Sequence, residues 1–367
     1  MLPIKAKNFV VELNNLSAGK TVETSYSENL QPHQVLLKID QFAFTSNNIT
    51  YAIVGDKMGY WKFFPTQERH GIIPVWGFAD VAVSNHPDIL PGQRFYGYYP
   101  MSSHLLVTAG KVAPHSFIDV STHRQGLAPV YNSYVNITQD LLYHPQKEAL
   151  HSLYAPLFQT SFLIEDLVAD QAFFGATHIV LTSASSKTAQ ALAFLLALRK
   201  KQENLSIHIV GLTSAKNTDF VQQLGWYDQV LTYGQITTLN PQQKHVVVDF
   251  TGNHQTQYQL QTHLQQQLAY NCLVGLTDWQ HLQGAQTLPQ PGEFFFAPTQ
   301  MQKRVKDWGL DELKKRVAKV WHQFTTEVQP AIVVDKHQGS QALEQLYQHM
   351  LSGQVDPQKG HTVSLGG

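Results

Sequence analysis

The first part of the chain alternates apolar and polar side chains with a period of two, as half-buried β-strands do. Turns rich in proline and glycine separate these stretches, notably at Pro91 and Gly92. The clearest alternating stretches are 33–45, 75–86, 93–99 and 104–112. Several short strands of this kind predict a small β-barrel or sandwich.

From about residue 146 the pattern becomes that of an α/β fold. Residues 146–170 carry apolar side chains at helical spacing, and short apolar runs then alternate with helical stretches. The predicted strands are 178–182, 205–212, 228–232, 245–252 and 272–277, and the predicted helices are 189–200, 217–224 and 255–267. Alternating strands and helices predict a parallel, doubly wound sheet. An amphipathic helix at 310–324 and a final helix, turn and strand follow.

Composition narrows the class of protein. The 367 residues include 26 basic and 27 acidic side chains, and this balance argues against nucleic acid as the main partner. We find no apolar run of the roughly 20 residues that span a bilayer, and the first residues soon become polar. We therefore expect a cytoplasmic protein without a membrane partner.

Cysteine and histidine usage predicts no metal site. The chain has 1 cysteine, Cys272, which excludes an intrachain disulfide and is typical of a small core residue. The 18 histidines show no tight metal-ligand spacing.

One turn carries the main candidate chemistry. Residues 178–200 predict a strand that leads through a short turn into a buried helix, an arrangement that presents a helix N-terminus to anions. Nucleotide folds usually have glycines in such a turn, and here there are none. Small hydroxyl residues and one lysine could hold a pyrophosphate instead, because hydroxyls donate and the amine adds positive charge. The expected phosphate ligands are Ser183, Ser185, Ser186, Lys187 and Thr188.

Two other interpretations of this turn stay open. In one, a serine or threonine merely caps the helix and Lys187 is solvated. In the other, Lys187 and Asp249 serve an NTPase, with the carboxylate on magnesium. The phosphate loop of NTPases, however, has glycine where Leu181 and Ser186 stand here.

The order of elements, together with the stretches 46–65, 74–81 and 183–189, resembles the medium-chain dehydrogenase/reductase superfamily. The similarity is to its zinc-free quinone-oxidoreductase branch and to an uncharacterised family of unknown function within the superfamily. The resemblance implies a GroES-like substrate domain at 1–145 and a Rossmann NADP(H)-binding domain at 146–304. Residues 305–367 would return to the substrate domain. It also implies an active-site cleft between the two domains.

The resemblance also shows where this chain departs from zinc enzymes. Gly77, Phe78 and Ala79 stand where zinc-dependent members have Gly-His-Glu, and a single cysteine cannot build the structural zinc site. We therefore expect a zinc-independent protein.

The end of the second predicted strand favours NADP(H) over NAD. NAD enzymes usually have an acidic residue there, whereas the first acid here is Asp219. Thr213, Ser214 and Lys216 could instead hold a 2′-phosphate, although an ordinary exposed loop would look the same.

Relatives contribute further cofactor contacts at positions that match this sequence. Thr251 and Gly252 correspond to residues that border the ribose, although Gly252 with Asn253 is equally a plain turn signal. Phe296 falls in a strand that flanks the nicotinamide in relatives, and plain core is the alternative there.

Polar amides and aromatic residues concentrate in residues 46–65, the expected substrate side. Tyr51 and Asn48 are the candidate catalytic residues, because each could donate a hydrogen bond to a developing oxyanion. The expected substrate-binding residues are Asn47, Tyr60, Trp61, Tyr131 and Asn132. A hydrophobic lid or small core is the competing interpretation.

The resemblance implies an NADPH-dependent oxidoreductase that reduces a quinone, an enone or an aldehyde by hydride transfer. Its substrate would be small, hydrophobic and electrophilic. A non-catalytic NADP(H)-binding sensor or scaffold is the alternative, since fold does not determine function, and loss of nucleotide binding is a third possibility. Relatives often dimerise through edge strands, so we expect a homodimer with residues 271–277 as a candidate edge.

Overall fold

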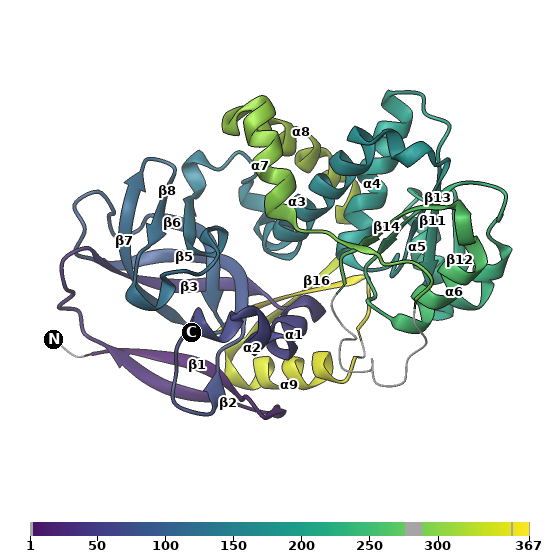
Figure 1. Ribbon diagram of the computed structural model, residues 1–367. Coiled ribbons are helices and arrows are strands. Elements are labelled where there is room, and N and C mark those ends of the chain that lie inside the picture. The colour runs from purple at the N-terminus through teal and green to yellow at the C-terminus, as the bar shows by residue number, and fades with distance from the viewer. Residues whose placement is uncertain (1–2, 276–287, 354, 367) are drawn as a thin grey trace. The chain divides into compact units, whose positions relative to one another are not determined.

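The computed structural model describes residues 3–275, 288–353 and 355–366 (Figure 1). The chain forms two compact units: the first unit comprises residues 1–153 and 332–367, and the second unit comprises residues 154–331. The sequence predicted boundaries at 145 and 305. In the part of the chain described, no helix is long and apolar enough to cross a membrane.

The first unit is rich in β-strands, and its main sheet closes on itself. The sheet order is β16-β17-β3-β5-β6-β9-β8-β7, and a further pairing of β3 with β7 closes a barrel. Its strands are β3 (Gln34–Ala43), β5 (Pro74–Ser84), β6 (Arg94–Pro100), β7 (His104–Ala113), β8 (Ser116–Asp119), β9 (Ser133–Asn136), β16 (Val333–Gln338) and β17 (Lys359–Ser364). The four clearest strands predicted from alternation are confirmed as β3, β5, β6 and β7.

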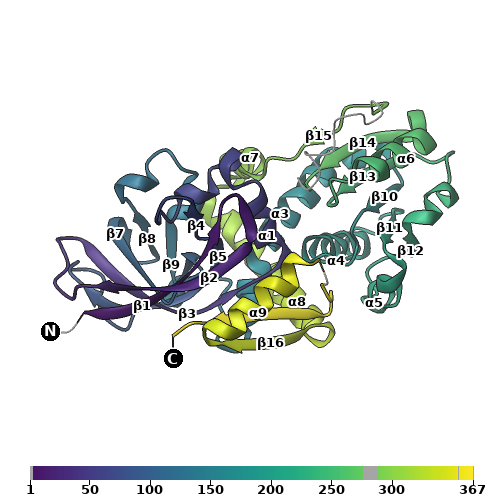
Figure 2. The same ribbon diagram turned by 90° about the horizontal axis from the view of Figure 1, so that it is seen from below.

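A smaller sheet and several helices complete the first unit. The sheet β2-β1-β4 consists of β1 (Ile4–Glu12), β2 (Asn15–Tyr26) and β4 (His70–Gly71). The helices are α1 (Ser46–Ile53), α2 (Gly55–Met58) and α9 (Gly339–Leu351). α9 lies along β2 and β16 (Figure 2), and the Tyr347 hydroxyl donates to the carbonyl of Leu16 at 2.5 Å. The last helix and strand thus belong to the same compact unit as the β-rich part.

The second unit contains a parallel sheet with the order β12-β11-β10-β13-β14-β15. Its strands are β10 (His178–Leu181), β11 (His208–Thr213), β12 (Gln229–Thr232), β13 (His245–Asp249), β14 (Leu268–Leu273) and β15 (Glu293–Phe294). Numbered along the unit, this is the order 3-2-1-4-5-6 of dinucleotide-binding folds, and the order reverses between β10 and β13. Ligands bind such sheets at the carboxyl ends of the strands beside that reversal.

Helices alternate with these strands or follow them (Figure 1). They are α3 (Glu148–Asp170), α4 (Lys187–Gln202), α5 (Thr218–Gln223), α6 (His254–Leu264), α7 (Ala297–Trp308) and α8 (Leu310–Val328). α8 packs on α4 and on α7. The ring of Phe324 on α8 lies 5.1 Å from that of Phe158 and 5.3 Å from that of Phe194. These contacts explain why α8 belongs to the second unit, although the sequence placed residues from 305 onward with the substrate domain.

Three histidines lie side by side at the amino ends of β10, β11 and β13. His178 is in register with both His208 and His245, and its ring centroid is 5.1 Å from each of theirs. His245 is fully buried, and its Nδ1 lies 2.7 Å from the carbonyl oxygen of Gln243. Burial, reinforced by His178 and His263, lowers the pKa of His245 from 6.5 to about 4.

This depressed pKa predicts acid sensitivity of the second unit. The folded state favours neutral His245, so its contribution is complete above the unfolded pKa and is lost as pH falls from about 6.5 toward 4. His245→Asn keeps a donor for the Gln243 carbonyl and cannot be protonated. We expect it to reduce the loss of stability between about pH 7.5 and about pH 5 by about 1–3 kcal/mol. Thermal midpoints at both pH values measure this, and parallel pH profiles for wild type and variant would contradict it.

Candidate functional site

The turn between β10 and α4 is held from both sides. The N–H of Ser183 donates to the Tyr233 hydroxyl at 3.0 Å, and the N–H of Ala184 donates to the carbonyl of Leu212 at 2.9 Å. Ser186 is the N-cap of α4, and its hydroxyl accepts from the N–H of Ala189 at 3.3 Å. Because the first N–H groups of a helix lack partners within it, this capped end is a ready anion site as well.

Ser183 adopts the backbone conformation that glycine normally supplies in such turns. Its φ is 48°, a left-handed value that costs a non-glycine residue about 1 kcal/mol. Close packing is supplied instead by Gly211 on β11, where a Cβ would lie 3.0 Å from the Cβ of Ala184. The glycine that lets the backbone approach closely therefore lies on the neighbouring strand β11 and not in the turn itself. No local sequence motif reveals this.

Ser185 joins the first two strand ends. Its hydroxyl accepts from the side-chain amide of Asn217 at 3.0 Å, and the hydroxyl of Thr213 donates to it at 3.4 Å. Ser214 precedes a short 3₁₀ turn (Ala215–Asn217) in which Lys216 is exposed. The structure therefore brings together two groups of expected cofactor ligands that lie about 30 residues apart.

Lys187 and Thr188 begin α4. The Lys187 amine lies 5.8 Å from the ring centroid of Tyr154, which is buried, so this lysine is not simply solvated. The backbone carbonyl of Thr188 accepts from the Ser161 hydroxyl at 2.8 Å, which fixes the first turn of α4 to α3.

Asp249 organises the loop that follows β13. Its buried carboxylate accepts from the Thr182 hydroxyl at 2.5 Å, from the N–H and hydroxyl of Thr251, and from the N–H of Gly252. Four hydrogen bonds within the fold therefore engage this carboxylate and tie the loop after β13 to the end of β10. Gly252 has a φ of 61°, and Asn253 caps α6.

Two features of residues 271–297 differ from what the sequence suggested: the exposure of Phe296 and the position of the expected dimer edge. Phe296 is 59% exposed whereas Phe295 is 8% exposed, so the core residue of this stretch is Phe295. β14 pairs with β13 on one side, and its Cys272 and Leu273 pair with β15 on the other, so these two residues lie inside the sheet rather than at an edge. Residues 276 and 277 of the predicted edge lie outside the described residues.

An aromatic cluster of the first unit contains most of the expected substrate residues. The ring of Tyr51 lies 4.5 Å from that of Tyr60, and the hydroxyls of Tyr60 and Tyr131 are 3.5 Å apart. Burial raises the pKa of Tyr51, Tyr60 and Tyr131 above the ordinary value of tyrosine. These phenols therefore stay protonated and act as hydrogen-bond donors. Asn47 and Trp76 lie against the Tyr51 hydroxyl and offset part of the rise.

Asn48 is a structural residue in this arrangement. Its carbonyl oxygen accepts from the N–H and hydroxyl of Thr45 at 2.8 and 3.1 Å, and its amide donates to the carbonyl of Pro74 at 2.9 Å. Both polar atoms of Asn48 are engaged within the fold, and Asn48 completes the capping box of α1 with Thr45, so we correct its assignment as a proton donor.

Trp61 and Asn132 also have structural roles. The indole of Trp61 packs against Gly55 and Gly71, where a Cβ would lie 2.2 and 2.4 Å from its ring atoms. Asn132 is buried, and its side-chain oxygen accepts from the Arg124 guanidinium at 3.2 Å. Both contacts form only when the loops around these residues fold, so the residue type alone did not distinguish them from substrate contacts.

Sequence reasoning missed the aromatic residues that β5 and β6 add to this cluster. Trp76 and Tyr98 are opposite each other in register, with ring centroids 5.0 Å apart, and Tyr96 stacks on Trp76 at 5.6 Å. The available signal was the alternation of aromatic residues along both predicted strands. Phe78, at the position of the zinc-binding histidine of relatives, packs on Tyr96 at 5.2 Å.

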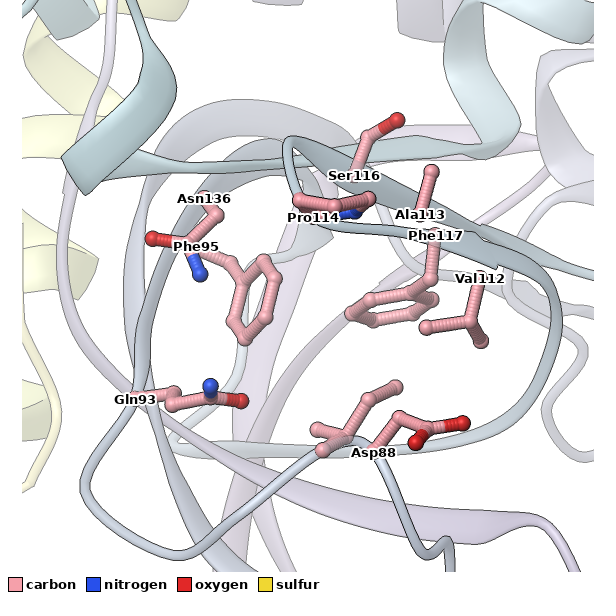
Figure 3. Close-up of a pocket in the computed structure, with 10 residues that line it drawn as sticks. Asp88, Gln93, Phe95, Val112, Ala113, Pro114, Ser116, Phe117 and Asn136 are labelled. Atoms are coloured by element: carbon pink, nitrogen blue, oxygen red, sulfur yellow. The ribbon is translucent and has the colours of Figure 1, made fainter.

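A small pocket lies elsewhere in the first unit (Figure 3). Its volume is about 80 Å³, which is too small for a cofactor or a drug-sized ligand. The rings of Phe95 and Phe117 meet there at 5.0 Å, with Asp88 and Gln93 among the polar lining residues. None of the expected site residues lines it. Among residues 3–275, 288–353 and 355–366, no group of three or more histidine, cysteine or acidic side chains could hold a metal ion.

The closed barrel with its C-terminal return and the separate parallel sheet agree with the fold expected from the resemblance to the medium-chain dehydrogenases/reductases. Residues 42–356 match the model of a family described as a protein of unknown function (DUF2855), and the chain belongs to this family. No curated protein matches the sequence.

Solved structures share this fold at low identity. CurA from Vibrio vulnificus in complex with NADPH is 11% identical with a TM-score of 0.66, over 98% of this chain and 99% of that chain. A quinone oxidoreductase from Coxiella burnetii is 12% identical with a TM-score of 0.56, over 99% and 100%. Etr1p with NADP and crotonyl-CoA is 13% identical with a TM-score of 0.57, over 98% and 100%.

Proposed function

We propose that this protein is an NADPH-dependent, zinc-independent oxidoreductase that reduces a quinone, an enone or an aldehyde. The observation that carries the proposal is the hydroxyl-rich turn after β10, at the reversal of a sheet with dinucleotide-binding order. The strained φ of Ser183 adds to it, because strain at a non-glycine residue is characteristic of functional sites.

The chain's residues fit a dinucleotide phosphate. Around the N-terminus of α4, the hydroxyls of Ser183, Ser185 and Thr188 would donate to pyrophosphate oxygens, and Lys187 would add positive charge. Ser186 would cap the helix whose dipole favours the anion. The link from Asn217 to Ser185 supports one continuous surface from this turn to the second strand end.

We propose that the cofactor is NADP(H) rather than NAD(H), because of the residues in the loop after β11. Lys216 is exposed in this loop and Ser214 is partly exposed. No acidic side chain lies between the end of β11 and Asp219. Thr213 is buried, so we assign it to holding the loop rather than to direct contact. Thr251 and Gly252 would border the ribose, and exposed Phe296 would flank the nicotinamide.

Tyr51 would complete the reaction on the substrate side. Bound NADPH would supply a hydride to the electrophilic carbon. The electron pair of the reduced double bond then passes to the substrate oxygen, and the Tyr51 hydroxyl would donate the proton to it. Asn47 would lie beside this hydroxyl, and Tyr60 and Tyr131 would provide the planar, apolar surroundings.

The solved neighbours agree with this proposal. Several were solved with NADPH or NADP, and the Etr1p complex contains crotonyl-CoA beside the cofactor. A homodimer remains part of the proposal. Within the described sheet β15 is the terminal strand, and Phe294 on it is 48% exposed.

The test is a titration of cofactor-stripped protein with NADPH and with NADH, followed by nicotinamide fluorescence and thermal midpoint. We expect tight NADPH binding, weaker NADH binding, and a higher midpoint with NADPH. Absence of binding to either would refute the proposal. Binding without turnover across quinones, enones and aldehydes would indicate the non-catalytic alternative.

A matched pair at Ser183 locates the phosphate site in the same titration. Ser183→Ala removes the hydroxyl and keeps the strain, whereas Ser183→Gly removes both. We expect both variants to weaken NADPH binding about 3- to 10-fold, as loss of one hydrogen bond would do. Only the glycine variant should also be more stable, by up to about 1 kcal/mol. Unchanged affinity in both variants would exclude a phosphate contact by this hydroxyl.

A further inference from the structure

Gln190 is the only polar side chain in the buried stretch 189–196 of α4. It is fully buried, and burial of an amide costs free energy unless both of its ends form hydrogen bonds. Both ends are paired here: Nε2 donates to the backbone carbonyl of Ser185 at 2.7 Å, and Oε1 accepts from the Tyr154 hydroxyl at 2.7 Å. This amide therefore connects α3 to the turn before α4.

The neighbours of this amide determine the direction in which it points. A carbonyl oxygen can only accept a hydrogen bond, so the nitrogen of Gln190 must face Ser185 and its oxygen must face Tyr154. Tyr154 is also buried, and the centroid of its ring lies 5.8 Å from the Lys187 amine. The hydroxyl and the ring of Tyr154 thus serve two different residues of the first turn of α4.

The peptide unit between Ser185 and Ser186 is held at both of its polar ends. Ser185 precedes the N-cap Ser186, so its carbonyl lies outside the hydrogen-bond ladder of α4 and needs a partner from elsewhere. Gln190 supplies this partner, and the N–H of Ser186 donates to the carbonyl of Ser183 at 2.7 Å. Without Gln190, only the N–H end of this peptide unit would be fixed.

The orientation of this peptide unit matters for an anion at the turn. Carbonyl oxygens carry partial negative charge and repel phosphate, whereas successive N–H groups form a concavity that binds it. The Ser185 carbonyl is turned toward a fully buried amide, and the Ala184 carbonyl accepts from the Tyr227 hydroxyl at 2.9 Å. The turn is therefore left to face a phosphate with its N–H groups and hydroxyls.

We propose that Gln190 is the positioning residue of the phosphate turn and that the Tyr154 hydroxyl holds its amide in the required direction. This inference rests on the proposed function and deepens it, because it explains how a turn without glycine keeps the Ser185 carbonyl away from a bound pyrophosphate. As a fully buried residue, Gln190 acts through this peptide unit and not by touching the cofactor.

The test compares two probes that share adenosine: ADP-ribose contains the pyrophosphate, and adenosine 2′-monophosphate lacks it. Their binding to the full chain is measured by calorimetry. Gln190→Met keeps the length of the side chain and loses the amide, and we expect it to weaken ADP-ribose binding about 10-fold and to leave binding of the monophosphate unchanged. Tyr154→Phe keeps the ring beside Lys187 and loses only the hydroxyl, so we expect a smaller loss of ADP-ribose affinity, about 3-fold.

Gln261→Met is the matched control, because it removes a second buried amide from the same unit. Gln261 lies on α6, donates to the side-chain oxygen of Gln257 at 3.2 Å and accepts from the N–H of Gln290 at 2.9 Å. Both methionine variants lose two buried hydrogen bonds and should have lower thermal midpoints. Only Gln190→Met should lose affinity for ADP-ribose, and a merely structural role would not produce this difference.

Three results would overturn the proposal. In the first, Gln190→Met keeps its affinity for ADP-ribose within about 2-fold. In the second, it loses affinity for both probes equally, and in the third, Gln261→Met loses as much affinity for ADP-ribose. If Gln190→Met does not fold, Tyr154→Phe decides, and unchanged ADP-ribose affinity overturns the proposal. A wild type that binds neither ADP-ribose nor NADPH would refute the proposed function itself, and this inference with it.

Discussion

Tyr51→Phe is expected to lower kcat/KM at least 100-fold with any electrophile that the wild type reduces, because general-acid catalysis typically contributes this much. The ring of Tyr51 packs on that of Tyr60 with centroids 4.5 Å apart, so phenylalanine fits the same space without the hydroxyl proton. Steady-state kinetics with NADPH measures the loss. The NADPH dissociation constant should not change.

The pH profile adds an independent check on this role. Burial raises the pKa of Tyr51 above the ordinary value of 10, so the proton stays on the hydroxyl throughout the neutral range. Activity should therefore show no loss from deprotonation of this group below about pH 10. A suitable control is Tyr347→Phe, which removes a hydroxyl from the same unit and should leave kcat/KM unchanged. Full activity in Tyr51→Phe would move the donor role to another residue.

Lys216→Ala should weaken NADPH binding about 10- to 100-fold and leave NADH binding unchanged, since the amine would face only the 2′-phosphate. Lys216 is exposed directly after β11, and the adjacent Asn217 is hydrogen-bonded to Ser185 in the phosphate turn. Fluorescence titrations with both cofactors measure the change in selectivity. Loss of affinity should become smaller at high salt, because salt screens exposed charges.

Lys201→Ala is the matched control for this prediction. Lys201 is exposed near the C-terminal end of α4, whereas the proposed phosphate site is at the N-terminal end of the same helix. Lys201→Ala and Lys216→Ala each remove one positive charge from the same unit, so a general electrostatic effect on binding would appear in both variants. An equal loss of NADPH and NADH affinity in Lys216→Ala would instead show that this lysine does not select between them.

Much of the fold could be predicted from the sequence because its periodicities are local. The alternation along 33–45 and 104–112 became β3 and β7, and the apolar runs at 178–182 and 245–252 became the central strands β10 and β13. The fifth strand was predicted too late, since the buried residues of β14 begin at Leu268. The short β15 offers too few residues for any pattern.

For the candidate site, too, the sequence predicted the features that depend on neighbouring residues and missed those that depend on the fold. Sequence alone identified the turn after β10 by its hydroxyls, its lysine and its missing glycines. It could not distinguish Asn48, Trp61 and Asn132 from substrate ligands, because the contacts that occupy them exist only in the folded chain: the Asn48 amide donates to the Pro74 carbonyl and Trp61 packs on Gly71. Trp76, Tyr96 and Tyr98 stayed hidden for a related reason, since only strand register places them on one face.

By itself, the sequence determined the class of fold, the glycine-free turn before α4 and the absence of an acid directly after the second strand of that sheet. These features are set by neighbours along the chain, through side-chain periodicity and backbone preference. Only the tertiary structure decided that Ser183 takes a left-handed φ, that Gly211 supplies the close approach, and that Asn48 is committed to capping. Each depends on hydrogen bonds or packing between strands and loops that are far apart in sequence, and these form only when the chain folds.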